Sequence, residues 1–137
     1  MASPCICTNL RAISRSITQY YDRALTDSGL RITQFSLLRA IARLDMPTII
    51  DLTGEISLNQ TTLTRNLRLL ERDGLLAITP GEDRRTRTLS LTKRGHAAIA
   101  KTIPLWERAQ AGIRARIGAP NLAAMVSVAA ALSRDAG

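Results

Sequence analysis

The fold is decided by residues 58–95, which read LNQTTLTRNLRLLERDGLLAITPGEDRRTRTLSLTKRG. Leucines recur every three or four positions in the first part, which is the spacing of one buried helix side. The second part has two runs with strand character, 75–79 and 86–91, on either side of a Pro-Gly-Glu-Asp turn. The segment therefore predicts a helix over residues 60–73, followed by a two-stranded hairpin. The buried back of this helix would be Leu63, Leu67 and Leu70.

Capping residues mark where the helices begin and end. Asn59 is a favoured N-cap residue, and Gly74 supplies the left-handed residue that commonly ends a helix. Thr48 with Asp51 three positions later resembles a capping box for a short preceding helix, and Thr92 is placed to cap a long following one. A short helix, a turn, a second helix and a hairpin predict a winged helix-turn-helix.

Further helices flank this unit on both sides. The first carries apolar residues at helical spacing and would end at Gly29; a second would be capped by Thr33 and broken by Pro47. A long helix follows Thr92, and a last helix follows Pro120. The side of the last helix that we expect to face inward carries Leu122, Met125, Val126, Ala129 and Leu132.

The 137 residues fit one domain. We expect a DNA-binding lobe over 30–95 and a helical region from 8–28 and 96–135. The first and last helices carry more apolar surface than so small a lobe can cover, which predicts a homodimer. The predicted fold class is mainly α with a small β-hairpin wing: a winged helix-turn-helix with N- and C-terminal dimerisation helices.

Composition narrows the classes of function. The chain is 45% apolar but only 3% aromatic, which favours helix packing, and Lys plus Arg number 19 against 11 for Asp plus Glu, a net charge of +8. Most of these cations are arginines, whose planar fork suits phosphates and guanine edges. No apolar run reaches the roughly 20 residues that span a bilayer. We expect a cytoplasmic protein with no membrane partner.

Metal, cofactor and catalytic chemistry are not expected. The two cysteines lie two residues apart, and His96 is the only histidine, so no zinc site can be completed. An enzyme would need a nucleophile with a base, or paired carboxylates in a pocket, and scattered acids with one histidine do not supply them. The sequence therefore predicts neither a metal, nor a cofactor, nor a catalytic residue.

The polar front of helix 60–73 and the hairpin tip carry groups that suit duplex DNA. Gln can pair with adenine, Thr with several bases or phosphates, and Arg65 or Arg68 with guanine, while the helix N-terminus attracts phosphate. An arginine at the hairpin tip can enter the narrow minor groove, and Asp83 would hold Arg85 pointed by a charge-assisted bond. The predicted DNA-binding residues are Asn59, Gln60, Thr61, Thr62, Thr64, Arg65, Arg68, Arg84, Arg85 and Arg87.

Two other interpretations of this surface remain open. The helix front could be a solvated face on which Arg68 and Arg72 only pair with Glu71 or Asp73. The unit could also be an architectural winged helix that binds DNA without specificity, or one that binds protein. That alternative predicts basic residues spread evenly over the surface, whereas here they concentrate on one helix and one hairpin tip.

The chain resembles the MarR family of bacterial transcription regulators over nearly its whole length. The most specific matches are LNQTTLTRNLRLLERDGLL, the Asp83-Arg84-Arg85 wing, Leu91-Thr92-x-x-Gly95, and GLRITQFSLLRAIARL at 29–44. The resemblance implies a homodimer whose first and last helices interlock and whose two lobes bind a pseudo-palindromic operator. It also implies that Thr61, Thr64, Arg65 and Arg68 face the major groove and Arg85 the minor groove.

The resemblance further implies release from DNA by a small aromatic acid or by cysteine oxidation. Cys7 begins the first helix, where the helix N-terminus and Arg11 would lower the pKa of its thiol. This is similar to the family's organic-peroxide-sensing branch, in which a tyrosine, here Tyr21, steadies the thiolate; that branch has a second tyrosine where this chain has Arg11. Cys5 could resolve an oxidised Cys7, although so short a loop strains a disulfide, and a bridge to another subunit or to a small thiol is easier.

A small aromatic acid would need a pocket with rings and a cation. The residues proposed for it are Tyr20, Phe35 and Trp106, with Arg11 to meet the carboxylate. The competing interpretations are that these rings belong to the core and that the two cysteines are inert residues near a frayed terminus.

Overall fold

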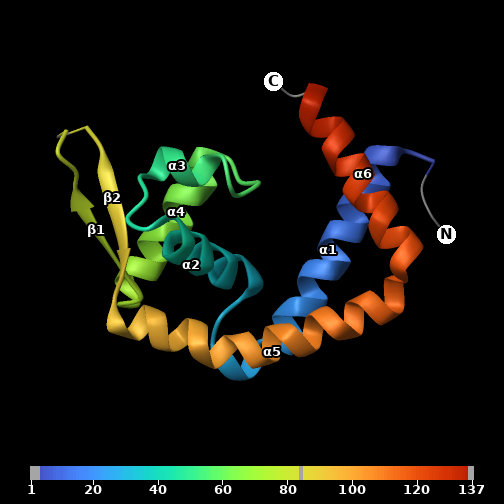
Figure 1. Ribbon diagram of the computed structural model, residues 1–137, viewed down its shortest axis with the longest axis horizontal. Coiled ribbons are helices and arrows are strands. Elements are labelled where there is room, and N and C mark those ends of the chain that lie inside the picture. The colour runs from blue at the N-terminus through green and yellow to red at the C-terminus, as the bar shows by residue number, and fades with distance from the viewer. Residues whose placement is uncertain (1–3, 84, 136–137) are drawn as a thin grey trace.

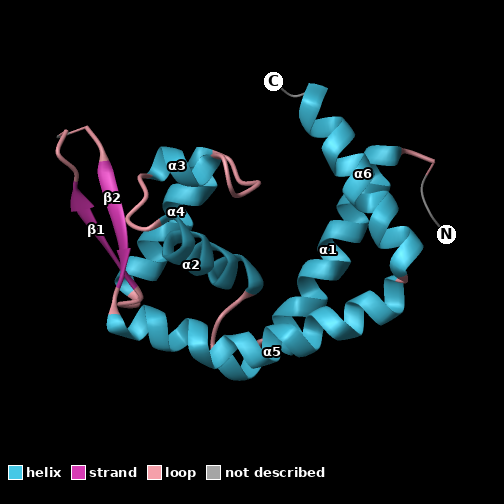
Figure 2. Cartoon of the chain, in the orientation of Figure 1, coloured by secondary structure: helices cyan, strands magenta, loops and turns pink. Residues whose placement is uncertain are grey.

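The computed structural model describes residues 4–83 and 85–135, and it has the predicted mainly helical fold with one hairpin (Figures 1 and 2). Its elements in chain order are α1 (Ile6–Ala24), a 3₁₀ turn (Thr26–Ser28), α2 (Ile32–Leu44), α3 (Ile49–Thr53), α4 (Gln60–Arg72), β1 (Leu76–Pro80), β2 (Arg87–Leu91), α5 (Lys93–Ile117) and α6 (Ala119–Asp135). Helices α3 and α4 form the helix-turn-helix, and β1 and β2 form the wing.

Three helix starts are capped as predicted. The Asn59 side chain accepts a hydrogen bond from the Thr62 N–H (2.8 Å) at the start of α4. At α3, the Thr48 N–H donates to the Asp51 carboxylate (2.8 Å) and the Asp51 N–H donates to the Thr48 hydroxyl (3.2 Å). The Thr92 hydroxyl accepts from the Gly95 N–H (3.0 Å) at the start of α5. Each of these caps satisfies donors that a helix end leaves open.

The start of α2 differs from the prediction. Thr33 lies inside the first turn, and the helix begins at Ile32. The Gln34 side chain accepts from the Arg31 N–H (2.9 Å), and the Asp22 carboxylate accepts from the Ile32 N–H (2.9 Å). Because Asp22 belongs to α1, the cap is supplied partly by a tertiary contact, which sequence spacing does not reveal.

The end of α1 also differs. The helix ends at Ala24, and Gly29 instead ends the short 3₁₀ turn in the left-handed conformation (φ 80°). Leu25, between the two, is fully buried in the core cluster. The chain therefore leaves the axis of α1 early in order to bury this leucine.

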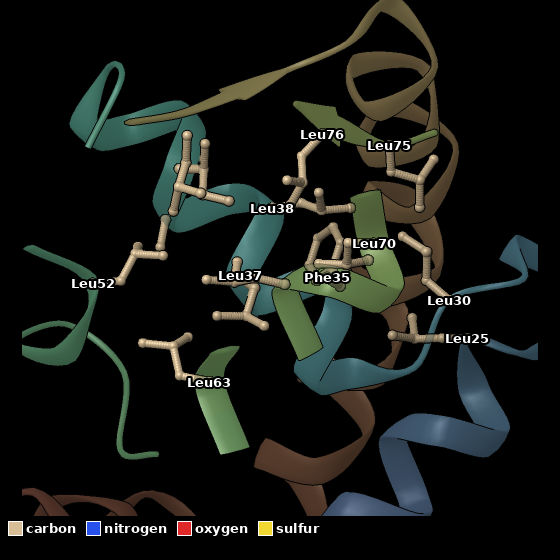
Figure 3. Packing of buried hydrophobic residues seen from close by; sticks show 14 residues of the cluster. Leu25, Leu30, Phe35, Leu37, Leu38, Leu52, Leu63, Leu70, Leu75 and Leu76 are labelled. Atoms are coloured by element: carbon tan, nitrogen blue, oxygen red, sulfur yellow. The ribbon is translucent and has the colours of Figure 1, made fainter. Parts of the chain in front are cut away.

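The hydrophobic core lies among α2, α3, α4 and the hairpin (Figure 3). Leu63, Leu67 and Leu70 are fully buried, as predicted for the back of α4. The first half of α5 closes this core through a set of partly buried residues. These are Ala98, Ile99, Ile103, Leu105 and Trp106. We call residues 30–106 the lobe.

The remaining helices form a second unit, which we call the arm: α1, residues 107–117 of α5, and α6. Figure 1 shows α5 passing beneath the lobe and continuing to the arm, where α1 and α6 rise from it. Tyr20 and Tyr21 attach α1 to α5, since their hydroxyls hydrogen-bond to the Ala109 carbonyl and the Gln110 side chain, respectively. The rings of the two tyrosines meet edge to face, with centroids 5.8 Å apart.

The predicted inward side of α6 is not buried within the chain. Met125, Val126 and Leu132 are exposed, as are Leu10 and Ile13 of α1. The α6 residues that line the cavity against α1 and α5 are Asn121, Ala124, Met125 and Val128, so only Met125 of the predicted set faces it. The predicted inward side was therefore wrong apart from Met125 and the half-buried Leu122. The apolar side of α6 therefore remains open, together with that of α1.

Among the described residues, no single helix is long and apolar enough to cross a membrane. Only α5 and α6 taken together reach that length and composition, and a bend of 100° separates them.

Candidate nucleic-acid interface

Helix α4 has a buried back and a charged front. Its three buried leucines fix the helix to the lobe, while Gln60, Thr61, Arg65 and Arg68 are exposed on the other side. Thr62 and Thr64 are half-buried between them. Because these leucines belong to the core cluster of the lobe and α4 contacts both α3 and β1, the front is held at a fixed orientation.

The first turn of α4 is polar and open. The Asn59 side-chain oxygen is engaged by the Thr62 N–H, and Asn66 bonds back to the Thr62 carbonyl (2.9 Å). These contacts order the turn while Gln60 and Thr61 stay exposed. Helix N-termini carry partial positive charge and free N–H groups, so this end suits a phosphate or a base edge.

The only acidic side chain in the pocket between α4 and the hairpin is Glu71, among the residues that the structure describes. Across residues 4–83 and 85–135, Arg72 pairs with Asp73 (3.4 Å), whereas Arg65 and Arg68 form no ion pair. The interpretation of this face as a set of local ion pairs therefore holds for Arg72 alone. Arg65 and Arg68 remain available to an external anion.

The wing is attached to the helix-turn-helix by more than its own ladder. Strands β1 and β2 pair antiparallel from Leu76–Leu91 to Pro80–Arg87. The Leu89 N–H also donates to the Pro47 carbonyl (2.9 Å), and Thr48 bridges to Thr88 just before α3. These two contacts join β2 to the segment that precedes α3, and they fix the direction in which the wing projects from the helix-turn-helix.

The wing tip is organised by Asp83. Its carboxylate accepts from the Arg85 backbone N–H (3.1 Å), and its carbonyl accepts from both the N–H and the hydroxyl of Thr86 (2.9 Å each). The sequence predicted that Asp83 would orient Arg85, and the observed hydrogen bond orients its backbone. Arg85 and Arg87 are exposed, and the predicted Arg84 lies outside the described residues.

The two elements share one groove. A pocket of about 160 Å³ lies between α4 and the hairpin, with Thr64 and Arg68 on one side and Arg87 on the other. Helix α4 and β1 are in direct contact beneath it. Two of the predicted arginines, from segments nearly twenty residues apart, thus line one depression.

Of the predicted redox residues, Cys5 and Cys7 are neighbours at the start of α1, whereas Tyr21 lies near its other end. Cys5 precedes α1 and Cys7 lies in its first turn, and both are exposed. Hydrogen bonds from the Thr8 hydroxyl, and then from the Thr8 and Cys7 backbone N–H groups, lower the pKa of Cys5. Tyr21 lies fourteen residues beyond Cys7, about 21 Å along a helix axis. Burial raises the pKa of Tyr21, and its hydroxyl is bonded to Gln110.

The four residues predicted for a ligand pocket are dispersed. Phe35 is buried in the lobe with Trp106 against it (ring centroids 5.9 Å apart), whereas Tyr20 lines a cavity of about 840 Å³ between α1, α5 and α6. Arg11 is exposed near the start of α1. The cation beside Phe35 and Trp106 is instead Arg39, which the sequence reasoning missed. Its position four residues after Phe35 on one helix is the signal that could have found it.

Comparison with known proteins gives a consistent family. The family model described as MarR family matches residues 30–86. The chain is 38% identical to the Mycobacterium tuberculosis transcriptional regulator MosR, whose crystal structure is in complex with DNA; the match covers 96% of this chain and 98% of MosR, with a TM-score of 0.85.

Two further relatives extend the match. The transcriptional activatory protein BadR of Rhodopseudomonas palustris is 35% identical over 104 residues, which cover 70% of this chain and 54% of BadR. The chain thus spans about half the length of this curated relative. BpsR of Bordetella bronchiseptica is 21% identical, with coverage of 96% of each chain and a TM-score of 0.84, and it shares the fold.

Proposed function

This chain belongs to the MarR family of transcription regulators, and from that premise we propose that it is a repressor that binds a pseudo-palindromic operator as a homodimer. The family's members are generally DNA-binding proteins without catalytic activity, and we propose that this chain also has none. We place its action in the cytoplasm, where the DNA is found.

The observation that carries the proposal is the shared groove between α4 and the wing. Its walls carry Arg68 and Arg87, and the front of α4 adds Arg65 with no acidic partner among the described residues. We assign the major groove to Thr61, Thr64, Arg65 and Arg68, with Gln60 and Thr62 beside them. We assign the minor groove to the wing arginines, Arg84, Arg85 and Arg87; Asp83 holds the backbone of Arg85. Arginine reads guanine by a bidentate contact and also favours a narrow minor groove.

The homodimer is supported by the open apolar side of the arm. The cavity between α1, α5 and α6 is lined mainly by apolar side chains, including Ile13, Ile113 and Met125. Exposed apolar surface that is contiguous over several helices is unfavourable in water and marks an interface. A second copy supplies the same helices in return, as a two-fold interface requires.

Selection from a pool of random duplexes tests the DNA proposal. We expect the bound fraction to converge on an inverted repeat whose half-sites lie about one helical turn apart, and to resist competition by random DNA. Recovery of no common sequence, with equal loss of all duplexes as salt rises, would favour the architectural alternative.

A transcription assay tests the repressor proposal. A promoter template containing the selected repeat should give less transcript when the protein is added; a rise would identify an activator, as the name of BadR states for that relative.

For the signal that releases DNA, we propose oxidation at the start of α1. The Cys7 thiolate attacks a peroxide, the O–O bond breaks, and the products are a sulfenic acid on Cys7 and water or an alcohol. A second thiol then displaces water and forms a disulfide. Cys5, whose pKa is lowered by Thr8, is one such thiol; the partner subunit or a small thiol could supply another. Since Tyr21 lies about 21 Å along the helix from Cys7, any contact between them would join two subunits.

A small aromatic acid is the competing effector. Of the residues predicted for its pocket, Phe35 and Trp106 are packed together in the lobe and only Tyr20 lines a described cavity. Because the predicted pocket residues are dispersed, oxidation of the cysteines is favoured over an aromatic acid as the signal that releases DNA.

Serine variants separate the two effectors. Mild peroxide should release wild-type protein from the selected operator and leave Cys7→Ser bound, whereas Cys5→Ser shows whether the second thiol is internal. Equal release of Cys7→Ser and wild type would remove Cys7 from the mechanism. Release by a panel of aromatic acids, unchanged in both serine variants, would instead support the ligand.

A further inference from the structure

Helix α5 belongs to both halves of the molecule, and the boundary falls within one turn. Trp106 is the last residue of α5 that packs on the lobe core. Ala109 and Gln110, one turn later, meet the two tyrosines of α1. The lobe and the arm are therefore attached to neighbouring turns of a single helix, and Trp106 is the lobe residue nearest the arm.

Two residues of α2 hold Trp106 from the lobe side. Phe35 lies against the indole with an interplanar angle of 45°. Arg39, one helical turn further along α2, places its guanidinium carbon 4.7 Å from the Trp106 ring centroid and 5.5 Å from that of Phe35. A guanidinium within about 6 Å of a ring face is attracted by the ring's electron density. All three groups are thus in mutual contact across the joint between α2 and α5.

We propose that Arg39 is a positioning residue that fixes the angle between the lobe and α5 and thereby sets the distance between half-sites that the dimer prefers. This inference rests on the proposed function, because only a dimer with two lobes has such a distance. Arg39 needs no contact with DNA in order to act in this way.

Because α5 is long, a small change in the angle between the lobe and α5 produces a larger displacement of α4 and the wing relative to the arm. The arm is the part that would contact a second copy, so the position of each lobe depends on the angle at which α2 packs on α5. Arg39 contributes to that angle at Trp106, the last of several α5 residues that pack on the lobe core. Successive base pairs are separated by about 3.4 Å along the duplex, so a rotation that moves each lobe by a fraction of that distance changes which spacing fits best.

The experiment measures spacing preference and not affinity alone. Wild type, Arg39→Met and Arg39→Lys are titrated with the selected inverted repeat and with versions in which its centre is one or two base pairs longer or shorter. Met keeps an apolar stem on the two rings but lacks the cation, whereas Lys keeps a cation. Arg43→Ala, one turn further along α2 and paired with Glu55 on the surface, is the matched control for loss of charge.

We expect wild type to discriminate sharply against a change of one base pair and Arg39→Met to discriminate about threefold to fivefold less, the size of an exposed cation–π contact. Arg39→Lys should recover part of the preference, and Arg43→Ala should match wild type. Trp106 is the only tryptophan in the chain, so its emission reports directly on the joint: the maximum should shift in Arg39→Met and not in Arg43→Ala.

Three results would overturn the inference. The first is an unchanged spacing profile in Arg39→Met together with a shifted Trp106 emission, because the joint would be altered without effect on spacing. The second is an unchanged profile with unchanged emission, because Arg39 would then not hold the indole. The third is failure of wild-type protein to select any spaced repeat, which would remove the proposed function itself and with it this consequence.

Discussion

The lobe and the arm are both built from amphipathic helices, yet only the lobe closes a core. In the lobe, leucines of α2, α3, α4 and the hairpin are almost completely removed from solvent. In the arm, only Tyr21 and Ala109 are buried among the described side chains, while Leu10, Met125 and Val126 are exposed. The same helical pattern thus has two outcomes. The lobe buries its apolar side chains within one chain, whereas the proposed homodimer would supply the packing that the arm lacks.

The strongest test of the difference between the two units places a carboxylate on an exposed apolar residue of the arm and, as a control, on one of the lobe. Val126→Asp should dissociate the dimer, because a two-fold interface would bury two unpaired carboxyl groups, and each costs more than the roughly 2–7 kcal/mol of an unpaired neutral polar group. Val126 is 70% exposed in the single chain. Sedimentation equilibrium should show monomers over the concentration range in which wild type is dimeric.

The matched control lies on the lobe. Ile50 of α3 is 71% exposed, so Ile50→Asp makes the same kind of change at the same exposure. We expect that variant to remain dimeric. A dimer that survives Val126→Asp would show that the exposed side of α6 is not the interface.

The second effect tests the closed core. Leu67→Ala should lower the free energy of unfolding by about 2–5 kcal/mol, because it leaves a cavity under α4. Its neighbour Leu69 lies on the same helix but is 37% exposed, against 0% for Leu67. Leu69→Ala should therefore cost about 0.5 kcal/mol or less. Urea unfolding of both variants at equal protein concentration measures the difference, and equal costs would contradict the assignment of α4's buried side.

The two units also differ in how far sequence reasoning could reach them. The lobe was predicted well because its signals are local. Asn59, Thr48 and Thr92 cap helices whose partners lie three residues away, and the leucine spacing of α4 states which side is buried. Interactions between residues three or four positions apart can be predicted from the spacing of residue types in the sequence.

Apart from Arg39, whose spacing from Phe35 is local, the errors arise from contacts over long distances. Thr33 was predicted as a cap because the true contribution of Asp22 comes from another helix. The predicted inward side of α6 is exposed apart from the half-buried Leu122, because no segment of the same chain covers it. Phe35, Trp106, Tyr20 and Arg11 were grouped by chemistry, yet the fold places the first two in the lobe and the others in the arm. Periodicity identifies a surface without identifying what covers it.

A third prediction separates function from stability within the lobe. Arg65→Ala should weaken binding to the selected operator by about 1–3 kcal/mol and relax the preference at one base position, if this side chain reads a base. Its unfolding free energy should change by no more than about 0.5 kcal/mol, since the residue is exposed. Fluorescence anisotropy with single-base operator variants measures both the loss and the relaxed position.

Arg72→Ala is the control for this variant. Arg72 lies at the other end of α4 and is paired with Asp73, so binding should stay close to that of wild type. An unchanged base preference in Arg65→Ala would assign that residue to the phosphates instead.

The smallest effect concerns the wing. If Arg85 meets the DNA backbone charge in each of two lobes, Arg85→Ala removes two contacts, and the slope of log K against log salt becomes less steep by about 0.9 for each contact, or about 1.8 in total. Lys101→Ala removes a charge from an exposed position on α5 and should leave the slope unchanged.

Asp83 holds the Arg85 backbone through the Arg85 N–H. Asp83→Ala should therefore weaken binding, because the cation is no longer held in place. The slope should stay that of wild type at high protein concentration, because the cation is still present. A slope that changes equally in Arg85→Ala and Lys101→Ala would mean that the wing contributes only to overall charge, and the lobe's specificity would then reside in α4 alone.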